Sequence, residues 1–395
     1  MTEFAACSAR ANARRDRWQI QRRAGVLMVS AFCTLLLAAC QSAGPGEVLG
    51  IGAPISEKET VGSGSVSVTL LLPRSGSSTA VESARDMYDG ARLAVTELGG
   101  GSVKLTVMDT KGSADLARQQ AEEAVASGTK LILTGHGASA AIARVSSTDQ
   151  PPVIDLSSAQ ADRKGTFALA SDEISSALGG VRAAVAAKQD KIVAVVPEDM
   201  SSLDKDRLSR GIRKEGGVLI GQVTYPAAEN AIAAVLAGKR SAFEKATTLV
   251  ILGSGRAPIA VANAAAVLGD KITTLVGSSG WARELFTAPV LNGALIAMVD
   301  QRSLAELGDR YKAATGRTLS LDAAFAYDAV ALATGLVRSG GGEAISVNTL
   351  RSKAGFRGAT GVFRFDDAGT VERRYSLYRI EGGKPVLLAD GENAF

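Results

Sequence analysis

The sequence predicts an α/β protein built from two doubly wound lobes. From residue 66 onward, short apolar runs of strand length alternate with helical patterns, as in parallel strands covered by helices on both faces. The chain has 395 residues, of which 46% are hydrophobic and 21% charged, enough apolar material for two cores. The clearest runs are too many for one open sheet and lie at 66–72, 103–109, 131–134, 192–197, 218–225, 248–252, 272–276 and 294–299.

Residues 1–39 are predicted to be a signal peptide. An arginine-rich start leads into an uncharged apolar run at 24–39, which is shorter than the roughly 20 residues that span a bilayer comfortably. The run closes on Leu37-Ala38-Ala39-Cys40, which resembles the lipobox of bacterial lipoproteins. The resemblance implies that the Cys40 thiol carries the lipid, and an uncleaved membrane anchor is the alternative.

Residues 40–65 are expected to be the lipidated cysteine and a flexible tether, because the stretch is rich in Gly, Ser and Pro. A lipidated Cys40 implies a periplasmic protein held at a membrane. Gln41 after the cysteine favours the outer membrane, by resemblance to enteric lipoproteins.

Charge and cysteine content exclude several functions. The six arginines of residues 1–39 against two acids, Glu3 and Asp16, account for the whole net charge of +4, so the remainder is neutral and nucleic-acid binding is not expected. The three cysteines all lie within the first 40 residues and the single histidine is His136, so we expect no metal site and no cofactor. The sequence also lacks nucleophile-elbow, Walker and zinc-protease motifs, so it does not predict an enzyme.

One helix has clear ends in the sequence. Ser113 precedes a helical pattern and is expected to cap it, and Gly128 follows Ser127 at the position where a left-handed residue ends a helix.

Five motifs, in order along the chain, resemble the type I periplasmic binding proteins, in particular the leucine/isoleucine/valine-binding family. Each motif is weak alone, but their order over residues 66–395 is specific. They are the strand and turn at 68–76, the helix start Gly90-Ala91-Arg92, the loop Gly135-His136-Gly137-Ala138-Ser139, the helix segment Ala326-Tyr327-Asp328-Ala329-Val330 and the hairpin at 356–369.

The resemblance implies two Rossmann-like lobes that close on a ligand like a Venus flytrap. The chain would cross between them three times, which gives 66–170 and 300–345 to lobe one and 171–299 and 346–395 to lobe two. The ligand would lie outside the carboxyl ends of the parallel strands, where helix N-termini favour an anionic group.

The same resemblance implies a set of ligand contacts. For three of them a structural role is the alternative: Ser139 as a helix cap, His136 as a packed loop residue and Trp281 as a cover of the lobe surface. The implied contacts are Ser75, His136, Gly137, Ala138, Ser139, Ser157, Ser158, Ser279 and Trp281.

The sequence also departs from the family pattern. Amino-acid binders of this family usually hold the ligand ammonium with a Glu and bracket it with Tyr and Thr, whereas the matching positions are Ser279, Leu252 and Ala159. A Tyr expected after a lobe-two strand is replaced by the segment 197–201, in which Asp199 is interpreted as a helix cap. Because a buried ammonium without a carboxylate is costly, the standard amino-acid pose is not expected.

A second resemblance is to the penicillin-binding protein activators, which are lipoproteins that stimulate a peptidoglycan synthase. It rests on the segments 107–110, 281–283 and 288–294. We therefore expect a solute-binding lipoprotein that presents a small amino acid or peptide-like ligand to an ABC permease. The alternative is an activator whose partner is a peptidoglycan synthase.

Overall fold

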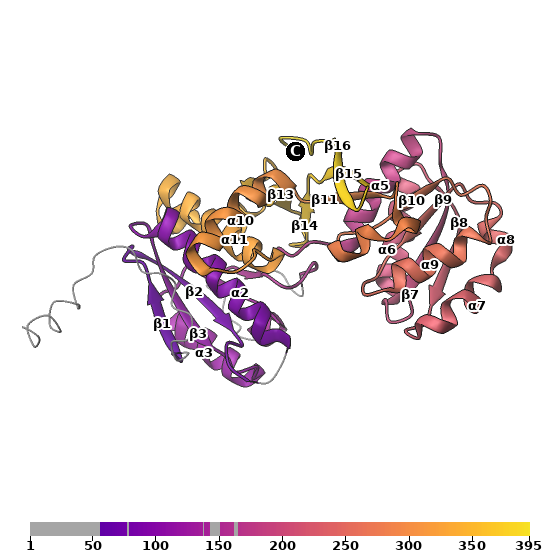
Figure 1. Ribbon diagram of the computed structural model, residues 1–395. Helices are drawn as coiled ribbons and strands as arrows, with labels where there is room; N and C mark the ends of the chain where they lie inside the picture. The colour runs from indigo at the N-terminus through magenta and orange to yellow at the C-terminus, as the bar shows by residue number, and fades with distance from the viewer. Residues whose placement is uncertain (1–55, 77–78, 137, 143–150, 162–164) are drawn as a thin grey trace, which may run out of the picture. The chain divides into compact units, whose positions relative to one another are not determined.

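The computed structural model describes residues 56–76, 79–136, 138–142, 151–161 and 165–395 (Figure 1). Within them the chain forms two mostly parallel sheets, each covered by helices, and a small antiparallel sheet. The predicted α/β class with two doubly wound lobes is therefore confirmed. The signal-peptide and lipid-attachment calls at residues 1–39 and Cys40 lie outside the described residues.

Lobe one contains a six-stranded sheet in the order β1-β3-β2-β4-β5-β6, parallel except for β1. Its strands are β1 (Lys58–Val61), β2 (Val66–Leu72), β3 (Val103–Asp109), β4 (Leu131–Thr134), β5 (Val153–Asp155) and β6 (Thr166–Ala168). Its helices are α2 (Thr79–Ala94), continued by a π-helical turn at Val95–Gly99, α3 (Ala114–Ala126), α4 (Ala138–Ile142), α10 (Gln301–Thr315), α11 (Leu321–Gly340) and α12 (Val347–Leu350), with a 3-10 turn at Gly342–Ala344.

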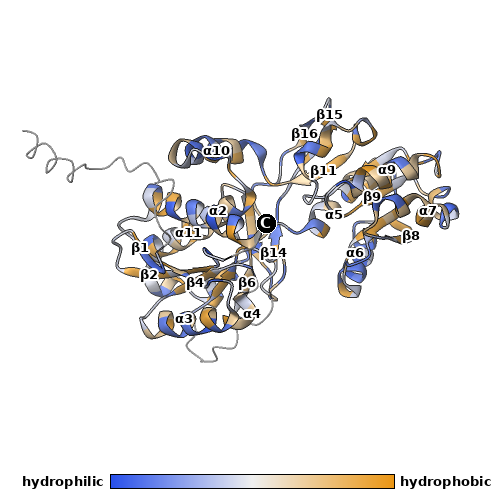
Figure 2. Cartoon of the chain, turned by 60° about the horizontal axis from the view of Figure 1, so that its bottom comes forward, coloured by the Kyte–Doolittle hydropathy of each residue, from blue (hydrophilic) through white to orange (hydrophobic). Residues whose placement is uncertain are grey.

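The strands of lobe one bury both faces. Val68, Leu70 and Leu72 of β2 pack with residues of α2 and α11, whereas Leu71 between them packs with α3 and α4 on the other face. Side chains that alternate in direction and are buried on both sides produce the continuous apolar run read from the sequence. In Figure 2 the strands are largely orange, the colour of hydrophobic residues.

Lobe two contains a seven-stranded sheet in the order β16-β15-β11-β10-β9-β7-β8. Its strands are β7 (Lys191–Pro197), β8 (Val218–Tyr225), β9 (Thr248–Ile251), β10 (Thr274–Val276), β11 (Leu295–Met298), β15 (Ser376–Glu381) and β16 (Lys384–Ala389). Its helices are α5 (Glu173–Ala186), α6 (Ser202–Lys214), α7 (Ile232–Ala237), α8 (Arg240–Phe243) and α9 (Ala257–Ala266), with 3-10 turns at Glu229–Ala231, Arg283–Thr287 and Pro289–Leu291.

The predicted elements are found with small differences at their ends. The runs at 66–72, 103–109, 131–134 and 218–225 are strands with those bounds, and the other four are strands one or two residues longer or shorter at an end. Ser113 caps α3 by accepting the Leu116 N–H at 3.3 Å, and Gly128 follows in the left-handed region with a φ of 78°. The hairpin expected at 356–369 is present as β12 (Phe356–Gly358) and β13 (Gly361–Phe365).

The chain passes three times between the lobes, after β6, after β11 and after β14 (Val371–Arg373). The expected division differs in one place. We expected 346–395 in lobe two, but β12, β13 and β14 form a separate sheet whose Phe363, Phe365 and Val371 belong to the core of lobe one. The Phe365 ring lies 5.0 Å from that of Phe167 in β6, between ring centroids. Only β15 and β16 of that segment join the sheet of lobe two.

The expected tether also ends earlier than residue 65. Residues 58–61 form β1, which pairs antiparallel with β3 at the edge of the sheet. Glu59 of this strand accepts hydrogen bonds from Arg74 at 3.2 Å and from the Tyr88 hydroxyl at 2.6 Å. The strand reads Lys-Glu-Thr-Val, and such a short polar sequence does not show the apolar pattern by which we recognised the other strands.

Candidate functional site

The loops after β4 and β5 come together at the carboxyl edge of the lobe-one sheet. Asp155 ends β5, and its Oδ1 accepts the Ser157 N–H at 2.8 Å, the Ser157 hydroxyl at 2.9 Å and the Ser158 N–H at 3.0 Å. A carboxylate that accepts from its own following residues fixes a tight turn. The Asp155 side chain therefore fixes the conformation of the two serines.

His136 joins this group from the other loop. Its backbone N–H donates to the Ser157 hydroxyl oxygen at 2.7 Å, and its ring Nε2 lies 2.8 Å from the Ser83 hydroxyl of α2. The residue is exposed and left-handed, with a φ of 57°. The structure thus brings together three of the expected contacts, His136, Ser157 and Ser158.

The rest of the loop after β4 lies close to Ser157. A Cβ on Gly135 would be 3.0 Å from the Met87 sulfur and 3.6 Å from the Ser157 hydroxyl oxygen, so a side chain there would press on Met87. Ala138 and Ser139 begin α4 and are buried. Gly137, between them and His136, lies outside the described residues.

Ser75 lies in a different group. The carboxylate of Asp109, at the end of β3, accepts the N–H groups of Arg74, Ser75 and Lys111 at 2.9, 3.2 and 2.9 Å. Burial alone raises the pKa of Asp109, but these bonds and that of the Ser75 hydroxyl outweigh it and lower the pKa. The hydrogen bonds of Ser75 therefore tie it to the end of β3, and they do not include His136 or Ser157.

In lobe two, Ser279 lies in the loop after β10. Its N–H donates to the Ser176 hydroxyl oxygen at 2.8 Å, and its own hydroxyl oxygen accepts from Ser171 at 3.1 Å. The Ser171 hydroxyl is also 3.1 Å from that of Tyr375. Ser171 follows β6 and Tyr375 follows β14, so Ser279 lies where two of the three connections between the lobes pass.

The expectation that Trp281 lines the ligand site is not supported by its position. The side chain is only 5% exposed and belongs to the lobe-two core with Leu285 and Phe286. A Cβ on Gly277 would lie 2.8 to 2.9 Å from the indole ring, so the absence of a side chain there makes room for the tryptophan. The large apolar ring is thus a core residue, and its Nε1 has no partner among the described residues.

Sequence reasoning missed a carboxylate beside the loop after β10. Glu173 begins α5, and its Oε2 accepts the Gly253 N–H at 3.2 Å and the Ser278 hydroxyl at 3.3 Å. Burial raises the pKa of Glu173, and the nearby charge of Asp172 adds to the effect, while the two hydrogen bonds lower it only in part. The carboxyl group therefore lies near Ser279, the position at which this chain lacks the glutamate of the family pattern.

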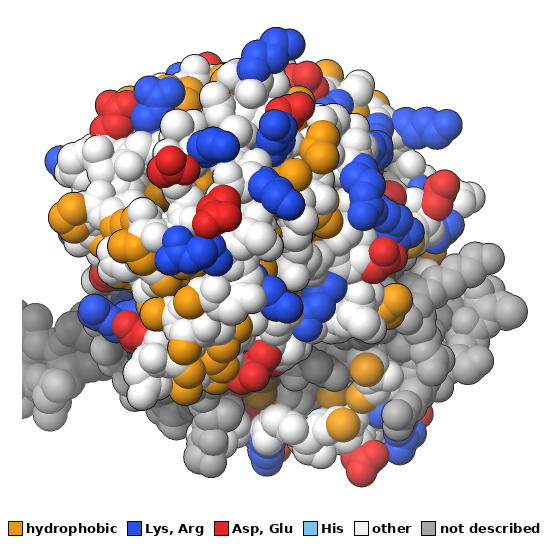
Figure 3. Space-filling model, turned by 90° about the vertical axis from the view of Figure 1, so that its right-hand side faces the viewer, with side chains coloured by type: hydrophobic (Ala, Val, Ile, Leu, Met, Phe, Trp, Pro, Cys, Tyr) orange, Lys and Arg blue, Asp and Glu red, His pale blue; other side chains and the backbone are white. Residues whose placement is uncertain are grey.

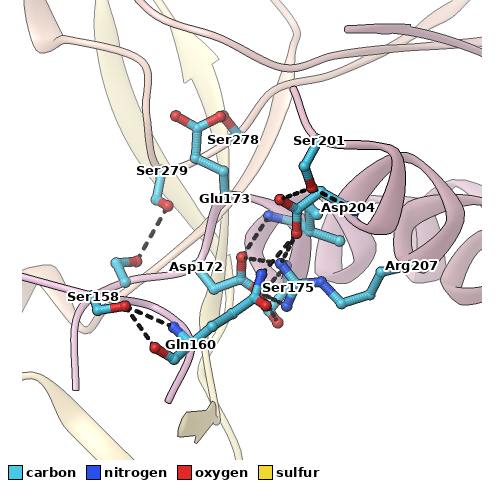
Figure 4. A network of polar contacts seen from close by, with 12 residues as sticks. Ser158, Gln160, Asp172, Glu173, Ser175, Ser201, Asp204, Arg207, Ser278 and Ser279 are labelled. Atoms are coloured by element: carbon cyan, nitrogen blue, oxygen red, sulfur yellow. Dashed lines mark hydrogen bonds and ion pairs between the residues drawn. The ribbon is translucent and has the colours of Figure 1, made fainter. Parts of the chain in front are cut away.

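Asp172 is held by a strong ion pair. It caps α5 by accepting from Ile174 and Ser175, and its two oxygens each accept from Arg207 of α6, at 2.8 and 2.9 Å. Arg207 also lies 3.4 Å from Asp204, which accepts from the Gln160 side chain at 2.7 Å (Figure 4). Gln160 follows Ser158, which donates to the Gln160 carbonyl oxygen at 2.6 Å. The polar group of Figure 4 thus extends from the loop after β5 to α6.

Some of these residues have a signal in the sequence. Asp155 stands two residues before Ser157 at the end of an apolar triplet, a pattern typical of a side chain that caps its own turn. Asp172-Glu173 precedes an apolar helical pattern, which is typical of a cap. Asp199, interpreted as a cap, does not fill that role, because the N-cap of α6 is Ser201.

The displayed face of the protein carries side chains of both charges. Figure 3 shows Lys and Arg side chains interspersed with Asp and Glu on the face that it displays. No helix formed by the described residues combines the length and apolar character needed to span a bilayer. Among the same residues, no three His, Cys, Asp or Glu side chains gather in a way that would hold a metal ion.

Comparison with known proteins identifies the family of this chain. Its residues 65–384 match the model of the periplasmic binding protein family. A search of curated proteins finds no match. Solved structures with the same fold include a transporter protein of Rhodospirillum rubrum, with a TM-score of 0.69 and 18% identity over 82% of this chain and 99% of the other.

Two further structures have recorded ligands. A branched-chain amino acid transporter binding protein of Streptococcus pneumoniae, in complex with isoleucine, has a TM-score of 0.58 and 19% identity over 83% and 99% of the two chains. A solute-binding protein of an ABC transporter from R. palustris, in complex with benzoate, has a TM-score of 0.57 and 19% identity over 84% and 98%. With two doubly wound lobes joined by three connections and a family match over most of its length, this chain belongs to the periplasmic binding protein family.

Proposed function

We propose that the protein is an extracytoplasmic solute-binding lipoprotein that presents a small ligand to an ABC importer. The observation that carries the proposal is the gathering of fixed polar groups at the carboxyl edges of both sheets, His136, Ser157 and Ser158 in lobe one and Glu173 and Ser279 in lobe two. In open α/β sheets this edge is where ligands bind. The proposed function is binding of the ligand without its chemical conversion.

The ligand class that we propose is a small carboxylate. Isoleucine and benzoate, the ligands named for two structural relatives, share a carboxylate group. In this chain, backbone N–H groups and hydroxyls of the loop that contains Gly135, Gly137 and Ser139 would receive that group. If Ser139 donates to it, Ser139→Ala weakens binding by about 5–30-fold, which corresponds to a loss of about 1–2 kcal/mol for one unmade hydrogen bond.

The proposed site differs from the expected one in its members. The proposed site keeps His136, Gly137, Ala138, Ser139, Ser157, Ser158 and Ser279, and also Ser75, which bonds to the end of β3. Trp281 leaves the set because it is a core residue. A calorimetric screen of carboxylate solutes, with Ser139→Ala as the test variant, checks this assignment.

We also propose that Cys40 is lipidated after removal of residues 1–39, and that the protein is held in the periplasm at the outer membrane. The support is the sequence Leu37-Ala38-Ala39-Cys40 followed by Gln41. A doubly or triply acylated N-terminus gives lasting attachment. Cys40→Ser should release the protein into the soluble periplasmic fraction. If this variant stays with the membrane after a high-salt wash, the lipidation proposal fails.

A second candidate function is activation of a peptidoglycan synthase. One observation favours it: the edge strand β16 exposes three successive aliphatic side chains, Val386, Leu387 and Leu388, at 41%, 36% and 40%. Exposed apolar residues on an unpaired strand edge are typical of a protein contact. Co-purification with a peptidoglycan synthase and not with a permease, together with failure to bind any small carboxylate, would favour this function over the first.

A further inference from the structure

We propose that residues 390–395 form a strap that crosses from lobe two to lobe one and limits the movement of the two lobes against each other. The strap follows β16, the edge strand of the lobe-two sheet, and its far end contacts the small sheet of β12, β13 and β14 on lobe one. It adds a fourth link to the three chain connections between the lobes. Such a link acts whether or not a solute is bound.

The first half of the strap lies against the third connection, where the chain passes from β14 to β15. The Gly391 N–H donates to the Ser376 hydroxyl oxygen at 2.9 Å. A Cβ on Gly391 would lie 2.3 Å from the Arg374 carbonyl oxygen, so a side chain at 391 would push the two segments apart. The Arg374 side chain pairs with Glu392 at 3.0 Å and donates to the Ala394 carbonyl oxygen at 3.2 Å. Two segments of the chain therefore lie side by side at this crossing.

The second half of the strap lies on the small sheet. The Arg357 guanidinium of β12 donates to the backbone and side-chain oxygens of Asn393 at 3.2 and 3.1 Å. The guanidiniums of Arg364 in β13 and of Arg374 each lie 4.3 Å from the centroid of the Phe395 ring. A guanidinium is attracted to the face of an aromatic ring, so these contacts hold the ring as well as the backbone. The strap is therefore fixed to β12 and β13.

The small sheet is in turn fixed to lobe one. Phe365 of β13 belongs to the lobe-one core, and the Asp328 carboxylate of α11 accepts the Thr360 N–H beside that strand at 2.9 Å. The strap also contacts lobe one at its first residue, because Asp390 pairs with Arg302 in the first turn of α10. The two ends of the strap therefore both tie the end of β16 to lobe one.

The strap makes the third connection harder to bend. The lobes of a hinged protein move by changes in the backbone angles of a few residues at the connections. The residues between β14 and β15 are Arg374 and Tyr375, and the strap lies against Arg374. Rotation about this point must therefore move or detach the strap. Because each exposed contact of this kind changes an equilibrium by a factor of roughly 1.5–5, several together favour one arrangement of the lobes by about tenfold.

The movement is measurable with two spin labels, because residues 41–395 contain no cysteine. The full-length chain carries Cys7→Ser, Cys33→Ser and Cys40→Ser. Labelled cysteines are introduced as Ala126→Cys in α3 of lobe one and Ala233→Cys in α7 of lobe two, at two exposed helix positions. Double electron–electron resonance then gives the distribution of label distances in the protein without added solute. We expect one main peak for the chain with its strap intact.

Removal of residues 390–395 deletes the strap, and the double variant Asn393→Ala/Phe395→Ala weakens it without shortening the chain. We expect the deletion to raise the ratio of distances outside the main peak to distances inside it by about tenfold, and the double variant by about threefold. Arg379→Ala is the matched control, because it breaks an exposed pair with Glu381 at 3.4 Å within β15 and leaves the strap intact. This control should keep the starting distribution.

The inference is wrong if the deletion and the double variant both keep the distance distribution of the intact chain, since the strap would then only cover the small sheet. It is also wrong if Arg379→Ala broadens the distribution as much as the double variant does, because the effect would then not belong to the strap. If the deletion variant does not melt cooperatively, the double variant alone decides. None of these results depends on solute binding, so each leaves the proposed function as it stands.

Discussion

Arg207 on α6 donates to both carboxylate oxygens of Asp172, the residue that caps α5. The Asp172 side chain is 5% exposed and that of Arg207 is 31% exposed, so water screens this pair less than a surface pair. A bidentate pair also fixes orientation, because both partners are planar. The pair therefore fixes the start of α5 against α6. It also fixes the position of Glu173, which is the next residue in the chain.

The first prediction concerns this pair. Asp172→Ala removes both the cap of α5 and the partner of Arg207, and we expect it to lower the free energy of unfolding by about 2–4 kcal/mol. Urea denaturation measures it. The control is Asp206→Ala, which breaks the exposed pair between Arg210 and Asp206 at 3.0 Å and should cost less than about 1 kcal/mol. Equal effects of the two variants would show that the Asp172 pair has no special role.

The second prediction concerns Asp328, which is 1% exposed and links α11 to the small sheet. Its Oδ2 accepts the Thr360 hydroxyl, whose oxygen in turn accepts from the buried Arg373 at 2.7 Å. Burial lowers the pKa of Arg373, and the negative charge of Asp328 opposes this. Asp328→Ala leaves two backbone N–H groups and the Thr360 hydroxyl without their acceptor and removes the negative charge near the Arg373 guanidinium, so we expect a loss of about 3–5 kcal/mol in urea denaturation.

Asp367 provides the comparison for that variant, because it is exposed in the turn before β14. Asp367→Ala should change the free energy of unfolding by less than about 0.5 kcal/mol. An Asp328→Ala protein as stable as the Asp367→Ala protein would contradict the structural role that we give to the buried carboxylate.

The third prediction is a pH dependence from Glu173. Because burial raises its pKa above the ordinary 4.5, the folded protein holds this proton more tightly than the unfolded chain does. Stability from this group is therefore present below pH 4.5 and is lost as the pH rises through the folded pKa. The negative charge of Asp172 raises the pKa of Glu173 further.

Glu173→Gln isolates that effect. Without ligand, the variant should melt at a higher temperature than the wild type at pH 7, and the difference should vanish near pH 4. Melting curves of the two proteins across this range measure it. A variant that is less stable than the wild type at pH 7 would mean that the bonds to Gly253 and Ser278 outweigh the cost of the buried charge.

The fourth prediction separates packing from ligand contact at Trp281. Because the ring is 95% buried in the core of lobe two, Trp281→Ala should cost about 3–5 kcal/mol of stability. Leu203→Ala, at a side chain that is 77% exposed, is the control and should have little effect. Calorimetry on the folded Trp281→Ala protein should give wild-type affinity for the solute. A large loss of affinity without a loss of stability would return Trp281 to the ligand site.

The sequence predicted the parts of the fold that follow from continuous apolar runs. The strand β2 was found with its bounds because its residues from Val68 to Leu72 are buried and pack on both faces of the sheet. The edge strand β1 and the three-residue strands β5 and β6 were missed, because a four-residue strand with three polar residues, or a strand of only three residues, shows no clear period. The placement of β13 in lobe one depends on Phe365 meeting Phe167, a contact between distant segments.

The candidate site was predictable only in part, for a related reason. His136 and Ser157 were expected in one site because the resemblance to the binding-protein family implied it, with the site at the carboxyl edge of a parallel sheet. That Ser157 is fixed by Asp155, or that Glu173 lies beside Gly280, depends on side-chain directions at the ends of different elements. The packing of Trp281 in the core could not be read from the sequence, because a large aromatic residue after a strand looks the same whether it lines a ligand site or fills a core.

The central claim is that the polar groups at the sheet edges bind a small carboxylate solute. The most direct test is calorimetric titration of the wild-type protein, first dialysed from denaturant and refolded to remove any bound solute, with amino acids and benzoate. The fifth prediction is that at least one of them binds at a single site with a dissociation constant of about 10 μM or lower, a binding free energy near −7 kcal/mol. A correctly refolded protein that binds none of them at millimolar concentration would contradict the account.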